Sequence, residues 1–107
     1  MQDLLDQRCR PIQGQPPMPA AEVQAMLGQL AGWSVADGAL QRQFRFADYH
    51  RTMAFVNAVA WLAHSEDHHP DMTVRWGDCT VRFSTHSVGG LSINDFICAA
   101  KVNALGA

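Results

Sequence analysis

Three histidines in this chain combine a residue type and a spacing that could support proton transfer. His68 and His69 stand together before Pro70, and His86 follows in the segment S-T-H. The ordinary pKa of a histidine is about 6.5, so one imidazole can accept a proton near neutral pH while another donates one. If folding brings the three rings together, they are candidates for acid–base catalysis.

The same residues also fit a metal site or an ordinary structural role. His64 and His68 are four residues apart, which is the spacing of two zinc ligands on one helix face, and His86 could be a third ligand. No H-E-x-x-H motif accompanies them, so we predict that no metal is bound. A single histidine is also often an ordinary core residue, and Pro70 by itself fits the end of a helix.

The segment that follows these histidines predicts how they are positioned. Residues 72–83, M-T-V-R-W-G-D-C-T-V-R-F, alternate between apolar and polar on both sides of Gly77–Asp78, which predicts a β-hairpin with a two-residue turn there. The apolar side chains then share one face of the hairpin. Extended outward, this register sets His69 opposite His86. We therefore expect H-H-P and S-T-H at the same end of the sheet, with the three imidazoles converging there.

The rest of the chain predicts an α+β domain. The expected elements are a helix over 20–31 stopped by Gly32, a hairpin turning at Asp37–Gly38, a helix from the N-cap Asp48 to about Asp67, the hairpin over 72–83, and a last helix opened by a capping box of Ser92 and Asp95. We expect a four-stranded antiparallel sheet with three helices packed on one face, in the order α-β-β-α-β-β-α.

Length and composition limit the domain count. A chain of 107 residues, 48% apolar and 17% charged, fits one domain with a modest core, and its low charge hints at a subunit interface. Residues 1–19 are rich in proline and glycine, so we predict a flexible N-terminal arm there. We assign residues 20–107 to the single domain.

Charge and hydropathy exclude several classes of partner. The net charge is -2 and no basic run is present, so we predict no nucleic-acid binding. No apolar stretch reaches the roughly 18 residues of a membrane span, and the acidic first residues do not resemble a signal peptide. We predict a cytoplasmic protein.

The three cysteines do not form a recognisable pattern. Cys9, Cys79 and Cys98 are odd in number and widely separated, which is typical of neither a disulfide framework nor a zinc knuckle. We predict three reduced thiols, with Cys79 packed in a strand and Cys98 packed in a helix.

From about Trp33 to Leu105 the chain resembles the pterin-4a-carbinolamine dehydratase family. The resemblance rests on G-W followed by D-G, then F-R-F, A-F-V-N-A-V-A, H-H-P, S-T-H, G-G-L-S and Asp95. It implies dehydration of a 4a-hydroxytetrahydropterin to a quinonoid dihydropterin, in the recycling of tetrahydropterin, without any cofactor. It also implies a homodimer or homotetramer, with an aromatic amino acid hydroxylase as a possible partner. Vertebrate relatives also serve as dimerisation cofactors, and some dehydratase-like proteins are suspected assembly factors, so a non-catalytic binding role is the alternative.

The resemblance also implies site residues. The catalytic residues would be His68, His69 and His86; Asp67, Ser84, Thr85 and Ser87 would join them in binding the pterin. As a hypothesis, His68 and His86 handle the protons, His69 orients the pterin, and Asp67 orients one imidazole. His64 and Met72 depart from the family pattern, since the first position is often acidic in relatives and some relatives have Trp or another bulky residue at the second.

Overall fold

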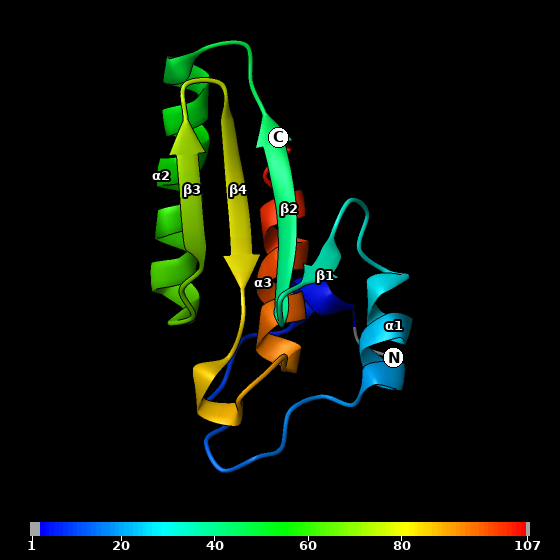
Figure 1. Ribbon diagram of the computed structural model, residues 1–107. Coiled ribbons are helices and arrows are strands. Elements are labelled where there is room, and N and C mark those ends of the chain that lie inside the picture. Colours follow the sequence, from blue (N-terminus) through cyan, green and yellow to red (C-terminus); the bar gives the residue numbers. More distant parts are fainter. Residues whose placement is uncertain (1–2, 107) are drawn as a thin grey trace.

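The computed structural model describes residues 3–106 and folds them into an α+β domain (Figure 1). Its main elements follow the predicted order of helix, two strands, helix, two strands and helix. The elements are η1 (Leu4–Asp6), α1 (Ala20–Leu27), β1 (Ser34–Ala36), β2 (Ala39–Arg45), α2 (Tyr49–Glu66), β3 (Asp71–Arg75), β4 (Asp78–Phe83), η2 (His86–Val88) and α3 (Ile93–Asn103). None of the helices within residues 3–106 has both the length and the apolar character needed to cross a membrane.

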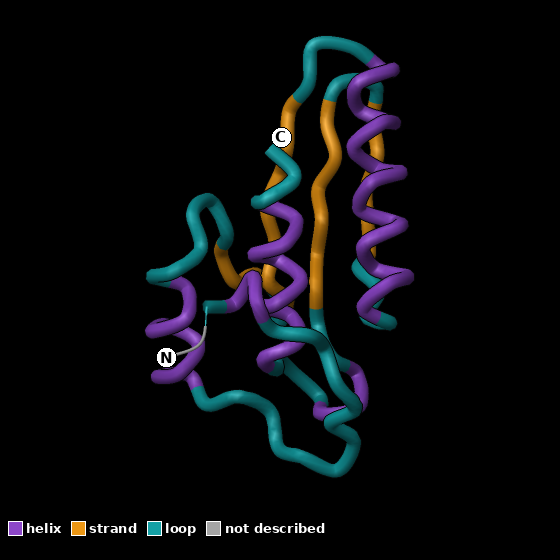
Figure 2. Tube along the Cα trace, turned by 180° about the vertical axis from the view of Figure 1, so that it is seen from behind, coloured by secondary structure: helices purple, strands orange, loops and turns teal. Residues whose placement is uncertain are grey.

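The four strands form one antiparallel sheet in the order β1-β2-β4-β3. Helices α2 and α3 cover one face of this sheet, and α1 lies beside β1 at its end (Figures 1 and 2). Alternation along β4 buries Cys79, Val81 and Phe83 against the helices and leaves Thr80 and Arg82 on the opposite face. The α3 side chains that complete this core are Phe96, Ile97, Cys98, Ala99 and Val102.

The local signals at the helix ends are confirmed for α2 and α3. The Asp48 side chain caps α2 by accepting a hydrogen bond from the backbone of Arg51, at 2.8 Å. Ser92 caps α3 with a complete capping box. The predicted helix over 20–31 is shorter, because it ends at Leu27 before Gly28, a residue that weakens helices.

The predicted register of the second hairpin is wrong by two residues. Arg75 pairs with Asp78, so the turn consists of Trp76 and Gly77 and not of Gly77 and Asp78. A shift of two keeps every strand side chain on its predicted face, because strands repeat every two residues. Trp76 lies in the turn and is 65% exposed, and Val74 of β3 is also exposed, at 38%.

Contacts from distant residues hold this turn. The backbone amide of Phe46 donates to the carbonyl of Gly77 at 2.8 Å, and the hydroxyl of Thr52 donates to the carbonyl of Trp76 at 3.0 Å. The observed pairing ends with Asp71 opposite Arg82, and extending it would set His69 opposite Ser84. The predicted opposition of His69 and His86 is therefore wrong.

The N-terminal segment lies along the domain, and Figure 1 shows it in blue passing below the start of α3. Leu4 and Ile12 are buried, and the amide of Met18 donates to the carbonyl of Leu91 at 2.8 Å. The flexibility predicted for residues 1–19 stays a prediction, and of these residues the structure describes 3–19. Their contacts make this segment part of the surroundings of the candidate site.

Candidate active site

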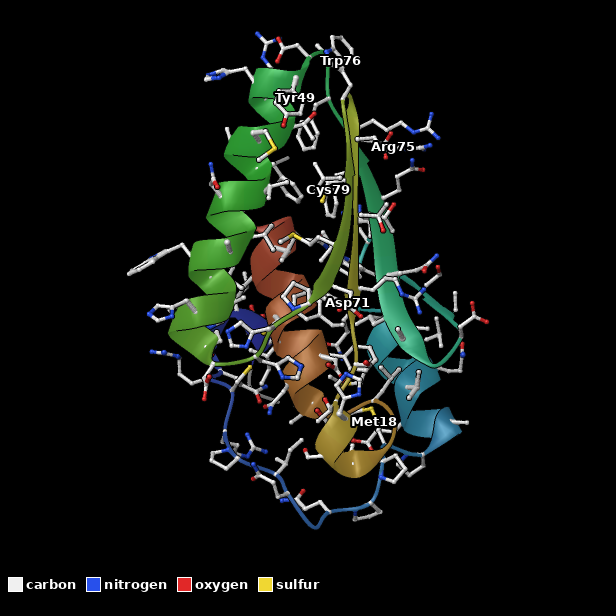
Figure 3. All side chains as sticks on the ribbon, turned by 60° about the vertical axis from the view of Figure 1, so that its left-hand side comes forward. Met18, Tyr49, Asp71, Arg75, Trp76 and Cys79 are labelled. Carbon is white, nitrogen blue, oxygen red and sulfur yellow. The ribbon has the colours of Figure 1, made fainter. Side chains whose placement is uncertain are left out.

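The candidate site forms at one end of the sheet, where the end of α2, the H-H-P segment, the end of β4, η2 and the start of α3 meet. Figure 3 labels Asp71, the first residue of β3, toward this end and Trp76 at the opposite end. Because Asp71 pairs with Arg82, H-H-P and S-T-H lie at the same end of the sheet. That part of the prediction is confirmed.

A short hydrogen bond joins His68 to Asp95. His68 Nε2 and Asp95 Oδ1 are 2.6 Å apart, the His68 side chain is 12% exposed, and Asp95 is fully buried. The His68 ring also lies nearly parallel to the ring of Phe83, with 5.9 Å between the centroids and 10° between the planes. The carboxylate and the aromatic ring together hold this imidazole in one position.

The second oxygen of Asp95 is also occupied. Asp95 Oδ2 accepts a hydrogen bond from the hydroxyl of Thr85 at 2.8 Å and another from the backbone amide of Ser92 at 2.9 Å. The bond from Ser92 belongs to the capping box of α3, which satisfies a backbone donor at the helix start. The first turn of α3 therefore fixes the carboxylate that holds His68.

This arrangement determines how His68 presents its two ring nitrogens. Because Asp95 Oδ2 already accepts two hydrogen bonds, Oδ1 serves as the acceptor for an Nε2–H donor on the imidazole. In the neutral ring, Nδ1 then carries the lone pair that can accept a proton. No hydrogen-bond partner of Nδ1 is found among residues 3–106. His68 is thus arranged as an oriented acid–base group.

A cavity of about 220 Å³ opens beside His68. Residues 9–13 of the N-terminal segment form part of its lining, together with Asp67, Thr85 and Ser87. Four of the predicted site residues therefore line one cavity.

His86 lines a different cavity. It is the exposed first residue of η2, and it borders a hollow of about 310 Å³ together with Ser84 and the Asp37–Gly38 turn. Thr85 lines both cavities. Thr85, which donates to the carboxylate of Asp95, is therefore a lining residue that the two cavities share.

His69 is exposed and lines neither of these two cavities. Among the ring contacts found within residues 3–106, none joins two of the three imidazoles of His68, His69 and His86. The structure brings these histidines to one end of the sheet, where His68 and His86 line separate cavities and His69 lines neither of the two.

The histidine pair considered as zinc ligands does not share a helix face. Helix α2 ends at Glu66, and Asp67 adopts a left-handed conformation with φ of 52°, so His68 lies outside the helix that carries His64. The ring of His64 instead lies 5.5 Å from that of Trp61. Within residues 3–106, no group of three or more metal-binding side chains is placed to hold an ion.

Comparison with known families matches residues 16–105 to the family described as "Pterin 4 alpha carbinolamine dehydratase". The chain belongs to this family. A protein of Nitrosomonas eutropha is 54% identical over 96% of this chain and 93% of its own length, and one of Chromobacterium violaceum is 52% identical over 96% and 95%. Both are named "Putative pterin-4-alpha-carbinolamine dehydratase".

Two solved structures have folds similar to that of this chain. A transcriptional coactivator/pterin dehydratase from Brucella melitensis has a TM-score of 0.81 and 30% identity, over 85% of this chain and 99% of that one. A pterin dehydratase-like protein, described as a RuBisCO assembly factor in the alpha-carboxysome, has a TM-score of 0.60 and 24% identity, over 71% and 90%. The second likeness shows the fold alone.

The carboxylate that orients His68 is not the one predicted from the sequence. The prediction was Asp67, whereas Asp95 makes the hydrogen bond to His68 and Asp67 is an exposed residue at the end of α2. The capping box already indicated that Asp95 points back toward Ser92. It did not indicate that His68, 27 positions earlier, lies on the other side of the carboxylate.

The wall formed by residues 9–13 was missed entirely. These residues precede the matched range of 16–105, and their contacts are with residues far along the chain. No local pattern in this segment predicts where it lies.

Proposed function

We propose that this protein dehydrates 4a-hydroxytetrahydropterin to quinonoid dihydropterin by histidine acid–base catalysis, and so acts in the recycling of tetrahydropterin. The family match and the names of the relatives support a dehydratase. The observation that carries the catalytic part of the proposal is the hydrogen bond of 2.6 Å between His68 and the fully buried Asp95, beside a cavity.

The reaction combines two proton transfers with the loss of water. Loss of water from the substrate requires one proton delivered to the hydroxyl group leaving C4a and one proton removed from N5. The electrons of the N5–H bond form the new double bond as the C–O bond breaks, so no redox change occurs. No metal, nucleotide or redox cofactor is required for these steps. Positioned acid–base groups typically contribute about 10²–10⁴-fold to such a reaction.

The orientation of His68 suits one of these proton transfers. Asp95 holds Nε2–H, which leaves Nδ1 as the nitrogen that exchanges a proton with the substrate. The carboxylate also stabilises the imidazolium that forms when Nδ1 accepts a proton. We assign the other proton transfer to His86 and the orientation of the pterin to His69.

The volumes of the two hollows indicate how much room each offers to a pterin. The cavity beside His68 has about 220 Å³, below the range of about 300–1,000 Å³ typical of small-molecule sites, and the hollow beside His86 adds about 310 Å³. To meet both histidines, a bicyclic ring would have to extend past Thr85, which lines both hollows. In this placement Asp67, Ser84, Thr85 and Ser87 contribute polar contacts to the ring.

The test is an assay of 4a-hydroxytetrahydropterin decay with purified variants. We expect His68→Ala and His86→Ala each to lower kcat by about 10²-fold, in line with the loss of one acid–base group, and the double variant to approach the uncatalysed rate. His69→Ala is expected to raise KM more than it lowers kcat. If it lowers turnover more than the other two variants while binding is unchanged, the assignment of roles is wrong.

A matched control replaces a histidine that lies outside the candidate site. His50 is exposed in the first turn of α2, and the H-H-P segment follows the opposite end of that helix. His50→Ala should therefore keep wild-type kcat and KM. The proposal fails if the His68 and His86 variants behave like this control.

A non-catalytic binding or assembly role is the second candidate. It is favoured by the pterin dehydratase-like protein described as an assembly factor, which has the same fold. The exposed aromatic side chains of Trp61 and Trp76 would suit a protein partner. Full loss of partner binding in Trp61→Ala or Trp76→Ala, with no dehydratase activity in the wild type, would support this role.

We also propose a homodimer or homotetramer in the cytoplasm, with an aromatic amino acid hydroxylase supplying the substrate. The exposed apolar side chains of Trp61, Val74 and Trp76 support association of copies. Light scattering on the purified protein tests the oligomeric state directly, and a mass equal to one chain at micromolar concentration would contradict it.

A further inference from the structure

Two cysteines far apart in the sequence lie in contact. Cys9 of the N-terminal segment and Cys98 of α3 have their sulfur atoms 3.5 Å apart, although 89 positions separate them in the chain. A disulfide bond has a sulfur–sulfur distance of about 2.05 Å, so the two atoms need to approach by about 1.5 Å. The third cysteine, Cys79, lies buried in β4 and has no such partner among residues 3–106.

The contact is built into the way the N-terminal segment lies on the domain. The backbone amide of Cys9 donates to Glu66 Oε1 at 2.8 Å. The next residue exchanges two hydrogen bonds with Asn94, because the Arg10 amide donates to Asn94 Oδ1 at 3.2 Å and Asn94 Nδ2 donates to the Arg10 carbonyl at 2.8 Å. These bonds hold the backbone on both sides of the Cys9 side chain, so the sulfur is aimed at Cys98.

The two thiols differ in their access to solvent. Cys98 is fully buried, whereas Cys9 is partly exposed and lines the cavity beside His68. The hydrogen bond with Cys9 and burial together raise the pKa of the Cys98 thiol, so Cys98 stays protonated. A small oxidant therefore reaches Cys9 first, and Cys98 is placed to react with the product.

We propose that Cys9 and Cys98 are a redox modification site that forms a reversible disulfide between the N-terminal segment and α3. The oxidant is a peroxide, and a low-molecular-weight or protein dithiol restores the two thiols. This inference does not rest on the dehydratase activity, since it concerns only the two sulfur atoms and the segments that carry them. It converts a contact held by hydrogen bonds into a covalent bond.

The chemistry balances with hydrogen peroxide as the oxidant. The Cys9 thiolate attacks one peroxide oxygen, the O–O bond breaks, and a sulfenic acid forms as the other oxygen leaves as water after taking up a proton. The Cys98 sulfur then attacks the Cys9 sulfur, releases its own proton and expels the hydroxyl group as a second water. In sum, two thiols and one peroxide give one disulfide and two waters.

The bond would change the cavity beside His68. Residues 9–13 form one wall of that cavity, and the disulfide would tie this wall to α3, the helix that carries Asp95. The reduced protein can release this wall by breaking noncovalent contacts only, namely the hydrogen bonds of Cys9 and Arg10 and the packing of buried Ile12. The oxidised protein cannot, so the N-terminal segment should become resistant to limited proteolysis.

The experiment treats the full-length reduced protein with a small excess of hydrogen peroxide and maps its unreduced tryptic peptides by mass spectrometry. Trypsin does not cut between Arg10 and Pro11, so Cys9 lies in peptide 9–42, Cys79 in 76–82 and Cys98 in 83–101. We expect peptide 9–42 linked to peptide 83–101, with a total mass lower by two hydrogen atoms. Treatment with a dithiol should restore both free peptides.

Two variants complete the test. Cys9→Ser keeps the size and partial exposure of the side chain, and it should abolish the link and the protection from proteolysis. Cys79→Ala removes the cysteine that lies outside the pair, and it should leave the link intact. The proposal is overturned if oxidised wild type carries a sulfinic acid on Cys9 with Cys98 still free, or if Cys9 pairs with a second chain.

Discussion

At the scale of single residues, Asp95 uses its two oxygens for two different purposes. One oxygen accepts hydrogen bonds from the Ser92 amide and the Thr85 hydroxyl, and the bond from Ser92 caps the start of α3. The other oxygen accepts a hydrogen bond from His68. The same carboxylate therefore stabilises the fold and orients the candidate acid–base group. A test of its positioning role needs a substitution that separates these two purposes.

Asp95→Asn makes that separation, because the amide has one acceptor and one donor. The Ser92 amide can only donate, so the side-chain oxygen of the asparagine should stay with it and the NH₂ group should turn toward His68. His68 Nε2 would then have to accept, which places the hydrogen on Nδ1. We expect kcat for pterin dehydration to fall by about 10²-fold with little change in KM.

The matched control for this prediction is Ser92→Gly. It removes the capping hydroxyl but keeps the backbone amide that holds Asp95, and a glycine N-cap costs only a few tenths of a kcal/mol. Activity close to that of the wild type is expected for this variant. Equal kcat losses in Ser92→Gly and Asp95→Asn would mean that the carboxylate matters only for folding.

At the scale of elements, the end of α2 places the H-H-P segment by an unusual backbone conformation. Asp67 has a φ of 52°, in the left-handed region that glycine adopts easily and other residues adopt at a cost. The helix stops there, and His68 leaves the helix axis toward Asp95. The side chain of Asp67 meanwhile borders the cavity.

Two substitutions at this position separate the backbone from the carboxylate. Asp67→Gly should be at least as stable as the wild type, and Asp67→Ala should be less stable than the glycine variant by about 1 kcal/mol, as measured by urea denaturation. Both variants remove the carboxylate. If Asp67 contacts the pterin, KM should therefore rise equally in the two variants under conditions in which both are folded. Unequal KM values under those conditions would contradict this prediction.

At the scale of the whole molecule, Glu66 connects the N-terminal segment to the domain. Its carboxylate accepts from the Cys9 amide at 2.8 Å and forms ion pairs of 2.9 Å with Arg8 and with Lys101 of α3. Burial would raise the pKa of Glu66, but these hydrogen bonds and positive charges outweigh it and hold the pKa below its ordinary value of 4.5. The buried carboxylate is therefore charged in the folded protein at neutral pH.

The depressed pKa of Glu66 predicts a loss of stability in acid. The unfolded chain takes up the Glu66 proton near its ordinary pKa of 4.5, while the folded chain takes it up only at lower pH. The contribution of Glu66 to the free energy of unfolding is thus complete above the unfolded pKa and lost as the pH falls through the folded pKa. Glu66→Gln should cost about 1–3 kcal/mol at neutral pH, and this difference from wild type should shrink in acid.

The other glutamate of the chain provides the control. Glu22 is exposed in α1, so Glu22→Gln should leave the free energy of unfolding within about 0.5 kcal/mol of wild type at every pH. Denaturant titrations at several pH values measure both differences. A Glu66→Gln difference that does not depend on pH would show that packing, and not charge, accounts for its effect.

Local chemistry determined much of this protein from the sequence alone. The N-cap at Asp48, the capping box at Ser92 and Asp95, and the turn at Asp37–Gly38 depend on residues next to one another, and the structure confirms each of them. The faces of the second hairpin were also correct, because side chains alternate along a strand in any register shifted by two. The family could be recognised because its motifs lie within short segments.

Tertiary structure decided the contacts between segments. The hairpin register depended on bonds from Phe46 and Thr52, the partner of His68 proved to be a carboxylate 27 positions away, and Cys9 met Cys98 across 89 positions. Such pairs form only when packed helices and strands carry them together. The energy that selects them comes from burying the core as a whole, so no local pattern of residues encodes them.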